Sequence, residues 1–180
     1  MIEISYMQMV LAISVIWLLV RVVCWAKAKG FDWKRELQLL LVYICIVVVV
    51  RFTFCPFGKV DGKIQPLLFD PQKVFPPWVN FRPFIYLFDY PTLKEALLNL
   101  IGNTAMFIPL GIVWPAVFKK LNTHWKVIAA GVGVSMTIEI LQLPFFGRAS
   151  DIDDLLLNCL GYLFGYGIYL LVCRQLRKRL

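Results

Sequence analysis

The stretch that decides the fold spans residues 37–55 and reads LQLLLVYICIVVVVRFTFC. One charged side chain, Arg51, interrupts an otherwise apolar run. Its length is close to the roughly 20 residues that an α-helix needs to cross about 30 Å of hydrocarbon. We therefore predict a membrane-spanning helix here.

The same pattern recurs four times, at residues 4–26, 97–118, 127–146 and 153–173. Of the 180 residues, 60% are hydrophobic and 17% are charged, whereas soluble domains hold roughly 45–50% apolar residues. Short charged joints separate most of the runs, which favours one helical bundle in a membrane over a soluble core. We predict an all-α integral membrane protein, a bundle of about five transmembrane helices that forms a single membrane domain over residues 1–180.

Basic residues set the predicted orientation. They gather in the first joint, the third joint and the tail, whereas the second joint is nearly balanced and the fourth is acidic. The basic residues in question are Lys27, Lys29, Lys34, Arg35, Lys119, Lys120, Lys126, Arg174, Arg177, Lys178 and Arg179. Because cytoplasmic loops carry an excess of Lys and Arg, we place the N-terminus outside and the C-terminus in the cytoplasm. Topology thus explains the net charge of +8, and we expect no nucleic-acid partner.

The second joint, about residues 56–96, is long and rich in proline and aromatic residues. The prolines are Pro56, Pro66, Pro71, Pro76, Pro77, Pro83 and Pro91, and the rings are Phe75, Trp78, Phe81, Phe84, Tyr86, Phe88 and Tyr90. The prolines exclude a continuous helix, and the rings suit the interface between lipid and water. We predict an extracellular cap on the outer leaflet, with a loosely solvated loop as the alternative.

Polar side chains inside the apolar runs gather near the outer ends of four predicted helices. They are Arg51, Asn99, Asn103, Glu139, Gln142, Arg148, Asp151, Asp154 and Asn158. A charged side chain within a span costs about 2.5–3.5 kcal/mol, so it usually faces the bundle interior or an aqueous cavity. Spacings of three, four and seven place each set on one helix face. We predict an outward-facing polar chamber in which arginines pair with carboxylates.

Two plainer interpretations of these residues stay open. Amides and ion pairs inside a bilayer often only join helices to one another. Asp151 could also cap the fifth helix, where a carboxylate meets unpaired backbone amides and the positive end of the helix dipole.

Small residues along the fifth segment suggest close helix packing. Gly161 and Gly165 form a GxxxG pattern, and Gly167 follows. The pattern is typical of helix contacts within a fold or between copies of a chain. The sequence leaves the oligomeric state open.

The five cysteines show no CxxC spacing and lie mostly in apolar runs. We therefore predict buried free thiols, with no metal site and no cofactor. Only Cys55 and Cys159 fall close enough to the same end of the predicted bundle to pair, and the sequence does not decide whether they do.

Several short motifs occur in a characteristic order. They are RFTFCP at 51–56, NFRPF at 80–84, NLIGN at 99–103, FIPLG at 107–111, EILQ at 139–142, and then Arg148, Asp151, Asp154, Asn158 and Gly161. This order resembles the VanZ-like family over about residues 45–168. The resemblance implies a multi-pass plasma-membrane protein of bacteria, mostly Gram-positive, that lowers susceptibility to the lipoglycopeptide teicoplanin. Residues 1–36 do not contribute to it, so the subgroup stays open.

Three functional hypotheses follow. The first is a resistance protein whose polar chamber and cap bind a lipid-like or glycopeptide ligand or alter the outer leaflet; membrane lipids, a lipoglycopeptide or a lipid-linked cell-wall precursor are its candidate partners. The second is a membrane enzyme acting on an envelope lipid or lipid-linked precursor, with Glu139 or Asp154 as acid or base and Arg51 or Arg148 holding an anionic headgroup. A transporter ranks last, because the sequence shows no internal repeat. The sequence does not decide whether the chain is an enzyme.

Overall fold

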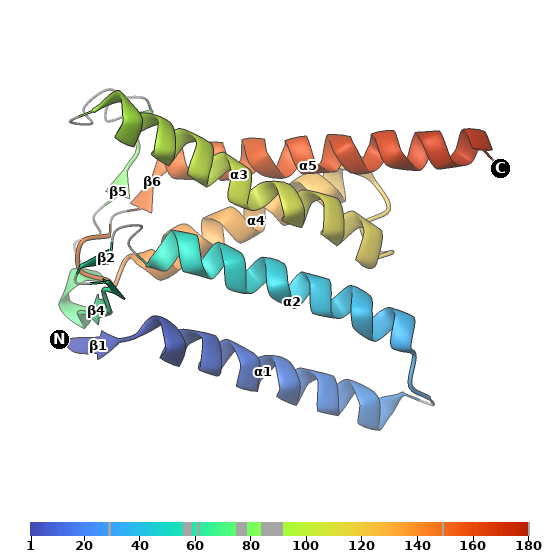
Figure 1. Cartoon of the computed structure of the whole chain (residues 1–180), viewed down its shortest axis with the longest axis horizontal. Helices are drawn as coiled ribbons and strands as arrows, with labels where there is room; N and C mark the ends of the chain where they lie inside the picture. The colour runs from blue at the N-terminus through green and yellow to red at the C-terminus, as the bar shows by residue number, and fades with distance from the viewer. Residues whose placement is uncertain are drawn as a thin grey trace.

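The computed structural model describes residues 1–28, 30–55, 59–60, 62–74, 79–83, 92–148 and 150–179. Five long helices make up most of this part of the chain: α1 (Tyr6–Lys27), α2 (Trp33–Phe54), α3 (Leu93–Val117), α4 (His124–Gln142) and α5 (Ile152–Arg179). All five are long and apolar enough to cross a membrane. The five predicted spans are confirmed, and the two chain termini lie at opposite ends of the bundle (Figure 1). The chain is a multi-pass helical membrane protein.

Polar side chains set where the helices begin. The Asp32 carboxylate accepts the backbone N–H of Lys34 at 3.0 Å and caps α2. The Thr92 hydroxyl accepts the N–H of Glu95 at 3.2 Å and caps α3. These caps satisfy N–H groups that have no partner inside the helix. As a result, α2 begins at Trp33 rather than 37, and α3 at Leu93 rather than 97.

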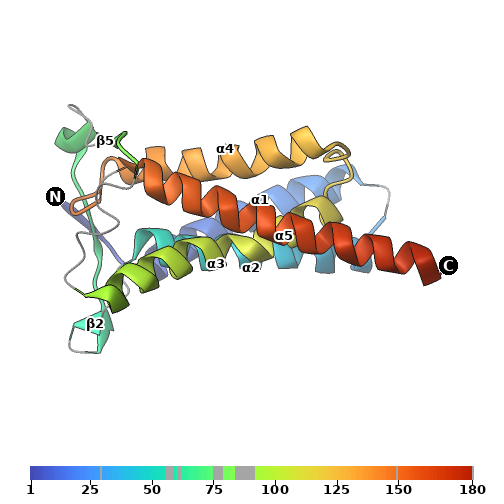
Figure 2. The same cartoon turned by 90° about the horizontal axis from the view of Figure 1, so that it is seen from above.

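The end of the bundle that carries the N-terminus also carries short strands (Figure 2). Here β1 (Ile2–Ile4) pairs antiparallel with β4 (Leu67–Phe69), and β2 (Lys59–Val60) pairs antiparallel with β3 (Lys63–Ile64). A parallel pair joins β5 (Val79–Asn80) to β6 (Ser150–Asp151), and a 3₁₀ turn covers Pro71–Val74. The described parts of the second joint are therefore tied by backbone hydrogen bonds to the N-terminus and to the joint before α5.

The cap predicted for the second joint lies only partly within the described residues. Outside them fall Phe75, Trp78, Phe84, Tyr86, Phe88 and Tyr90, with Pro56, Pro76, Pro77 and Pro91. Phe81 is described, and 77% of its surface is exposed. The position of this joint on the outer leaflet stays a prediction.

The helices α3 and α5 form the most closely packed pair. A Cβ added to Gly161 would lie 1.8 Å from the backbone oxygen of Thr104, and one added to Gly165 would lie 2.0 Å from that of Ile108. The GxxxG pattern therefore serves packing within the fold, which fills the face that a second copy would use. No such contact surrounds Gly167, where an added Cβ has nothing within 4 Å, so the close approach expected there is wrong.

The first helix lies at the edge of the bundle, beside α2 (Figure 1). None of its residues is buried. Its polar links to α2 are a hydrogen bond of 2.6 Å between the Ser14 and Tyr43 hydroxyls and an ion pair between Arg21 and Glu36. The fold's buried core lies among α2, α3, α4 and α5.

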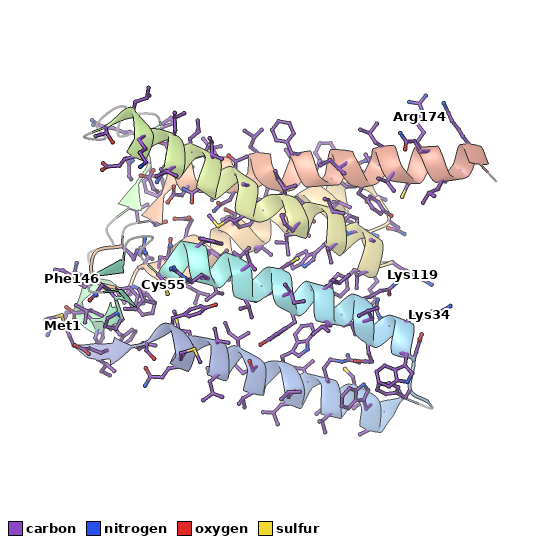
Figure 3. All side chains as sticks on the ribbon, in the orientation of Figure 1. Met1, Lys34, Cys55, Lys119, Phe146 and Arg174 are labelled. Carbon is purple, nitrogen blue, oxygen red and sulfur yellow. The ribbon has the colours of Figure 1, made fainter. Side chains whose placement is uncertain are left out.

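Basic side chains mark the end of the bundle opposite the strands. Figure 3 places Lys34, Lys119 and Arg174 together there, far from Met1 and Cys55. We call it the basic end. The separation of charge along the bundle matches the pattern from which the orientation was predicted.

Candidate functional site

The predicted site residues lie at the end of the bundle that carries the strands, which we call the polar end. Asn103, Glu139, Arg148, Asp151 and Asp154 define it. They come from α3, α4, the joint after α4, β6 and α5, respectively. The predicted gathering of polar groups from several helices at one depth is therefore present in the fold.

One part of the cluster joins α3 to α5. The Asn103 amide donates to Asp154 Oδ1 at 2.5 Å and to Asn99 Oδ1 at 3.2 Å. Asn103 itself is buried. The shared face predicted for Asn99 and Asn103 is thus real, and it holds the Asp154 carboxylate against α3.

A second part surrounds the joint between α4 and α5. Glu139, which is 4% exposed, accepts the backbone N–H of Asp151 at 3.0 Å. Asp151 Oδ1 accepts the Asn80 amide at 3.2 Å and the backbone N–H of Asp153 at 2.9 Å. The parallel register of β5 and β6 sets Asn80 opposite Asp151. The strand β5, the helix α4 and the joint before α5 therefore meet around the carboxylates of Glu139 and Asp151.

The structure corrects the helix face predicted for Asp151, Asp154 and Asn158. Asp151 lies in β6, because its backbone pairs with β5 and α5 begins only at Ile152. Its carboxylate accepts the N–H of Asp153 instead, which is the capping role considered as the plainer interpretation. Only Asp154 and Asn158 share a face of α5, one turn apart.

The arginines contact backbone carbonyls instead of the expected carboxylates. Arg148 Nη2 donates to Phe54 O at 3.0 Å, and Arg51 Nη1 donates to Cys55 O at 3.4 Å. Both oxygens belong to the C-terminal end of α2, where the helix dipole attracts cations. Between described residues, the one ion pair within 4 Å is that of Arg21 with Glu36, at the basic end. The predicted pairing of arginines with the carboxylates of the polar end is therefore wrong for the described part of the chain.

Arg148 still acts on the cluster through space. Burial lowers the pKa of its guanidinium, while its electrostatic interactions with the Cys55 thiol and with Asp154 oppose that shift. Burial also raises the pKa of Cys55, against the attraction of Arg51 and Arg148. The two arginines thus share one neighbour, Cys55, and Arg148 is the cation coupled to Asp154.

Two predicted residues, Gln142 and Asn158, join helices away from this cluster. The Gln142 amide donates to Thr53 O on α2 at 2.6 Å, and the Asn158 amide donates to the Ser135 hydroxyl on α4 at 3.2 Å. Both side chains are buried. For these two residues, the interpretation as links between helices fits the geometry.

The sequence profile of the family described as VanZ/LLP1 matches residues 40–173. The chain belongs to the VanZ/LLP1 family. The match includes all residues that define the polar end, the whole of α3 and α4 and most of α2 and α5, and it leaves out α1. The family resemblance seen over about residues 45–168 is confirmed.

A curated relative is Protein VanZ of Enterococcus faecium, which is 29% identical over 101 residues. The aligned region covers 56% of this chain and 58% of that protein, so less than two thirds of the relative is represented. No solved structure matches this VanZ/LLP1 chain.

Sequence reasoning missed Asn80 as a member of the site, and it overlooked Ser135 and Tyr162 in the seam between α4 and α5. Asn80 opens the NFRPF motif that the family resemblance used, so its position in that motif was an available signal. Tyr162 continues the four-residue spacing of Asp154 and Asn158 along α5. Its hydroxyl is buried without a hydrogen-bond partner among the residues described.

The cysteines and acidic residues of this VanZ/LLP1 chain show what the polar end can hold. All five cysteines are free thiols, Cys55 and Cys159 included, so these two do not form a disulfide. Within the described ranges, no group of three or more His, Cys, Asp and Glu side chains is placed to hold a metal ion. The polar end offers carboxylates, amides and one coupled guanidinium, which suit hydroxyl, amide or charged groups of a ligand.

Proposed function

We propose that this chain lowers the susceptibility of a bacterial cell to lipoglycopeptide antibiotics such as teicoplanin, acting from the plasma membrane. Membership of the VanZ/LLP1 family and the similarity to Protein VanZ of Enterococcus faecium support the proposal. It requires the polar end to face outside. The basic side chains at the other end, among them Lys34, Lys119 and Arg174, favour that orientation (Figure 3).

The observation that carries the proposal is the convergence of Asn80, Asn103, Glu139, Asp151 and Asp154 at the polar end. Amide and carboxylate groups from five elements of the fold can together bind the amide and hydroxyl groups of a glycopeptide or of a lipid-like headgroup. The predicted polar chamber is thus the proposed binding site.

Exposed rings in segments next to this cluster in the chain, at the same end of the bundle, suit the lipid part of such a ligand (Figure 3). Phe146 is 54% exposed and Phe81 is 77% exposed, and both follow elements that carry site residues. Aromatic rings at the membrane interface can contact an acyl tail or order the outer leaflet. Either action would weaken the anchoring of an antibiotic that depends on a lipid tail.

The test is antibiotic susceptibility in a Gram-positive host that expresses the wild type or one of the variants Arg51→Ala, Glu139→Gln, Arg148→Ala and Asp154→Asn. We expect the wild type to protect against teicoplanin more than against vancomycin, and Glu139→Gln and Asp154→Asn to abolish this difference at unchanged membrane levels. Glu95→Gln is the matched control, because it removes the same charge from an exposed position at the start of α3.

Two results would contradict the proposal. Equal protection against teicoplanin and vancomycin would show that protection does not depend on the lipid tail of the antibiotic. Protection retained by all four site variants would return these residues to a structural role between helices.

One observation favours an enzyme as a second candidate function. The carboxylates of Glu139 and Asp154 interact electrostatically, and no described basic side chain lies within 4 Å of either. Two such carboxylates can exchange a proton with a bound headgroup, with one as acid and the other as base. Arg148, which is coupled to Asp154, would then attract an anionic substrate.

Lipid analysis separates this candidate from a binding protein. Mass spectrometry of envelope lipids and lipid-linked precursors would show a change in cells with the wild type and none in cells with Glu139→Gln. An unchanged profile in cells that express active wild-type protein would exclude the enzyme.

A further inference from the structure

A cavity of about 510 Å³ lies at the basic end, between the start of α4 and the last turns of α5. A hydrogen bond of 2.7 Å between the Tyr166 hydroxyl and His124 Nδ1 joins the two helices at this cavity. Tyr169 and Leu170 add an apolar wall on α5. The end of α3 and the joint before α4 complete the lining, and the contact between His124 and Tyr166 holds α4 against α5 at this cavity.

The charge of the cavity is positive. Arg174, Arg177 and Lys178 line it, all on α5, and all three are exposed. No aspartate or glutamate is among the described residues that line it. Thr123 and His124 bring the N-terminus of α4 to the same cavity, and a helix N-terminus attracts anions. These features together favour an anionic ligand.

The depth of the cavity points to a lipid headgroup. With 28 residues, α5 is about 42 Å long, which exceeds a hydrocarbon layer of about 30 Å. The 19 residues of α4 span only about 28 Å. The C-terminal part of α5 accordingly projects beyond the other helices (Figures 1 and 2). Arg174 and Arg177 lie on this projection, one or more turns beyond Tyr166 and Leu170 along α5. In a bilayer that the shorter helices cross, the two arginines would therefore lie among the lipid headgroups.

We propose that this cavity binds the phosphodiester headgroup of an anionic phospholipid from the leaflet at the basic end. Arg174 and Arg177 supply planar guanidinium groups that can hold phosphate oxygens with two hydrogen bonds each. Tyr169 and Leu170 contact the first carbons of an acyl chain. Basic cavities between transmembrane helices bind anionic lipids by this combination of charge and apolar contact. The site lies at the other end of the bundle from the polar end and does not depend on the proposed function.

The test uses the purified full-length chain in detergent, with phosphatidylglycerol and phosphatidylcholine as probes and native mass spectrometry to measure bound lipid. We expect the wild type to bind phosphatidylglycerol in preference to phosphatidylcholine. The double variant Arg174→Gln/Arg177→Gln should bind phosphatidylglycerol about tenfold more weakly, because each basic side chain near the headgroups strengthens the attraction. Both positions are exposed, so these changes leave the packed core intact.

The matched control is Lys27→Gln/Lys34→Gln, which removes the same charge at the same end, on α1 and α2. It should bind phosphatidylglycerol as the wild type does. An equal loss in both double variants would overturn the site, since it would show diffuse attraction to a basic surface. A wild type that binds both lipids equally would overturn it as well.

A soluble competitor distinguishes the two sources of a phosphate group. Glycerol 3-phosphate at the same concentration should not displace phosphatidylglycerol, because it lacks the acyl chains that contact Tyr169 and Leu170. Full displacement by glycerol 3-phosphate would assign the cavity to a soluble phosphate compound and overturn the lipid assignment.

Discussion

The pair of α3 with α5 and the pair of α1 with α2 use opposite means of association. The first pair has backbones in contact at Gly161 and Gly165 and a partly buried hydrogen bond between Asn103 and Asp154. The second pair meets through side chains, among them the two polar links and the Trp17 and Tyr43 rings, whose centroids lie 5.6 Å apart, and α1 buries none of its residues. Yet α1 has a higher mean hydropathy than α3 or α5. Hydropathy measures transfer into lipid, whereas small and polar residues determine which helices associate there.

The largest expected effect is at the glycine contact. Gly161→Ala should lower the free energy of unfolding by about 3 kcal/mol, because the new Cβ forces two helix backbones apart. The measurement is unfolding of the purified chain in mixed micelles titrated with dodecyl sulfate. Gly167→Ala is the matched control on the same helix, where a Cβ meets open space, and it should be neutral or up to about 1 kcal/mol stabilising. Equal effects at the two positions would mean that the α3–α5 contact does not hold the fold together.

A smaller effect is expected at the polar link of the same pair. Asn103→Leu removes the donor to Asp154 Oδ1 and should destabilise the fold by about 2 kcal/mol, since a partly buried carboxylate is left without this partner. The swapped variant Asn103→Asp/Asp154→Asn again offers one donor and one acceptor at this position. It should recover most of the loss in the same unfolding titration; no recovery would show that the hydrogen bond is not what Asn103 contributes.

The smallest effect is expected between α1 and α2. Ser14→Ala removes the hydrogen bond to Tyr43 and should lower the free energy of unfolding by about 0.5 kcal/mol, as is usual for hydrogen bonds between membrane helices. The same micelle titration provides the value, with Thr137→Val as control because that hydroxyl bonds only within its own helix. A loss as large as that of Gly161→Ala would contradict the peripheral position of α1.

The span count of this fold could be read from the sequence, but not all of the helix ends. The apolar runs predict five helices, because an apolar segment of about 20 residues is long enough to cross the hydrocarbon layer. The starts of α2 and α3 were placed too late, since the caps at Asp32 and Thr92 extend the helices into polar sequence. The end of α4 was placed too late as well, at 146 rather than Gln142. Pro144 follows there, and a proline has no backbone N–H with which to continue the helix.

The site was predictable in depth and composition but not in its contacts. Spacing along single helices correctly paired Asn99 with Asn103. It could not reveal that Asn80, from a joint, would meet Asp151 through the parallel pairing of β5 and β6. It also assigned the arginines to carboxylates, whereas Arg51 and Arg148 bind the carbonyl end of α2. Opposite charges in the sequence indicate that ion pairs are feasible, but helix geometry decides which groups come within reach.

The sequence by itself determined that this protein lies in a membrane, how many spans it has and at which end its basic joints lie. Those properties follow from local composition, because each segment partitions into lipid largely on its own. Only the tertiary structure decided which faces of the helices meet. Apart from a few polar positions the spans are apolar on all sides, so hydropathy alone does not set their rotation. Close contact at Gly161 and the hydrogen bonds of Asn103, Glu139 and Asp151 fix that rotation, and they bring together residues that lie far apart in the chain.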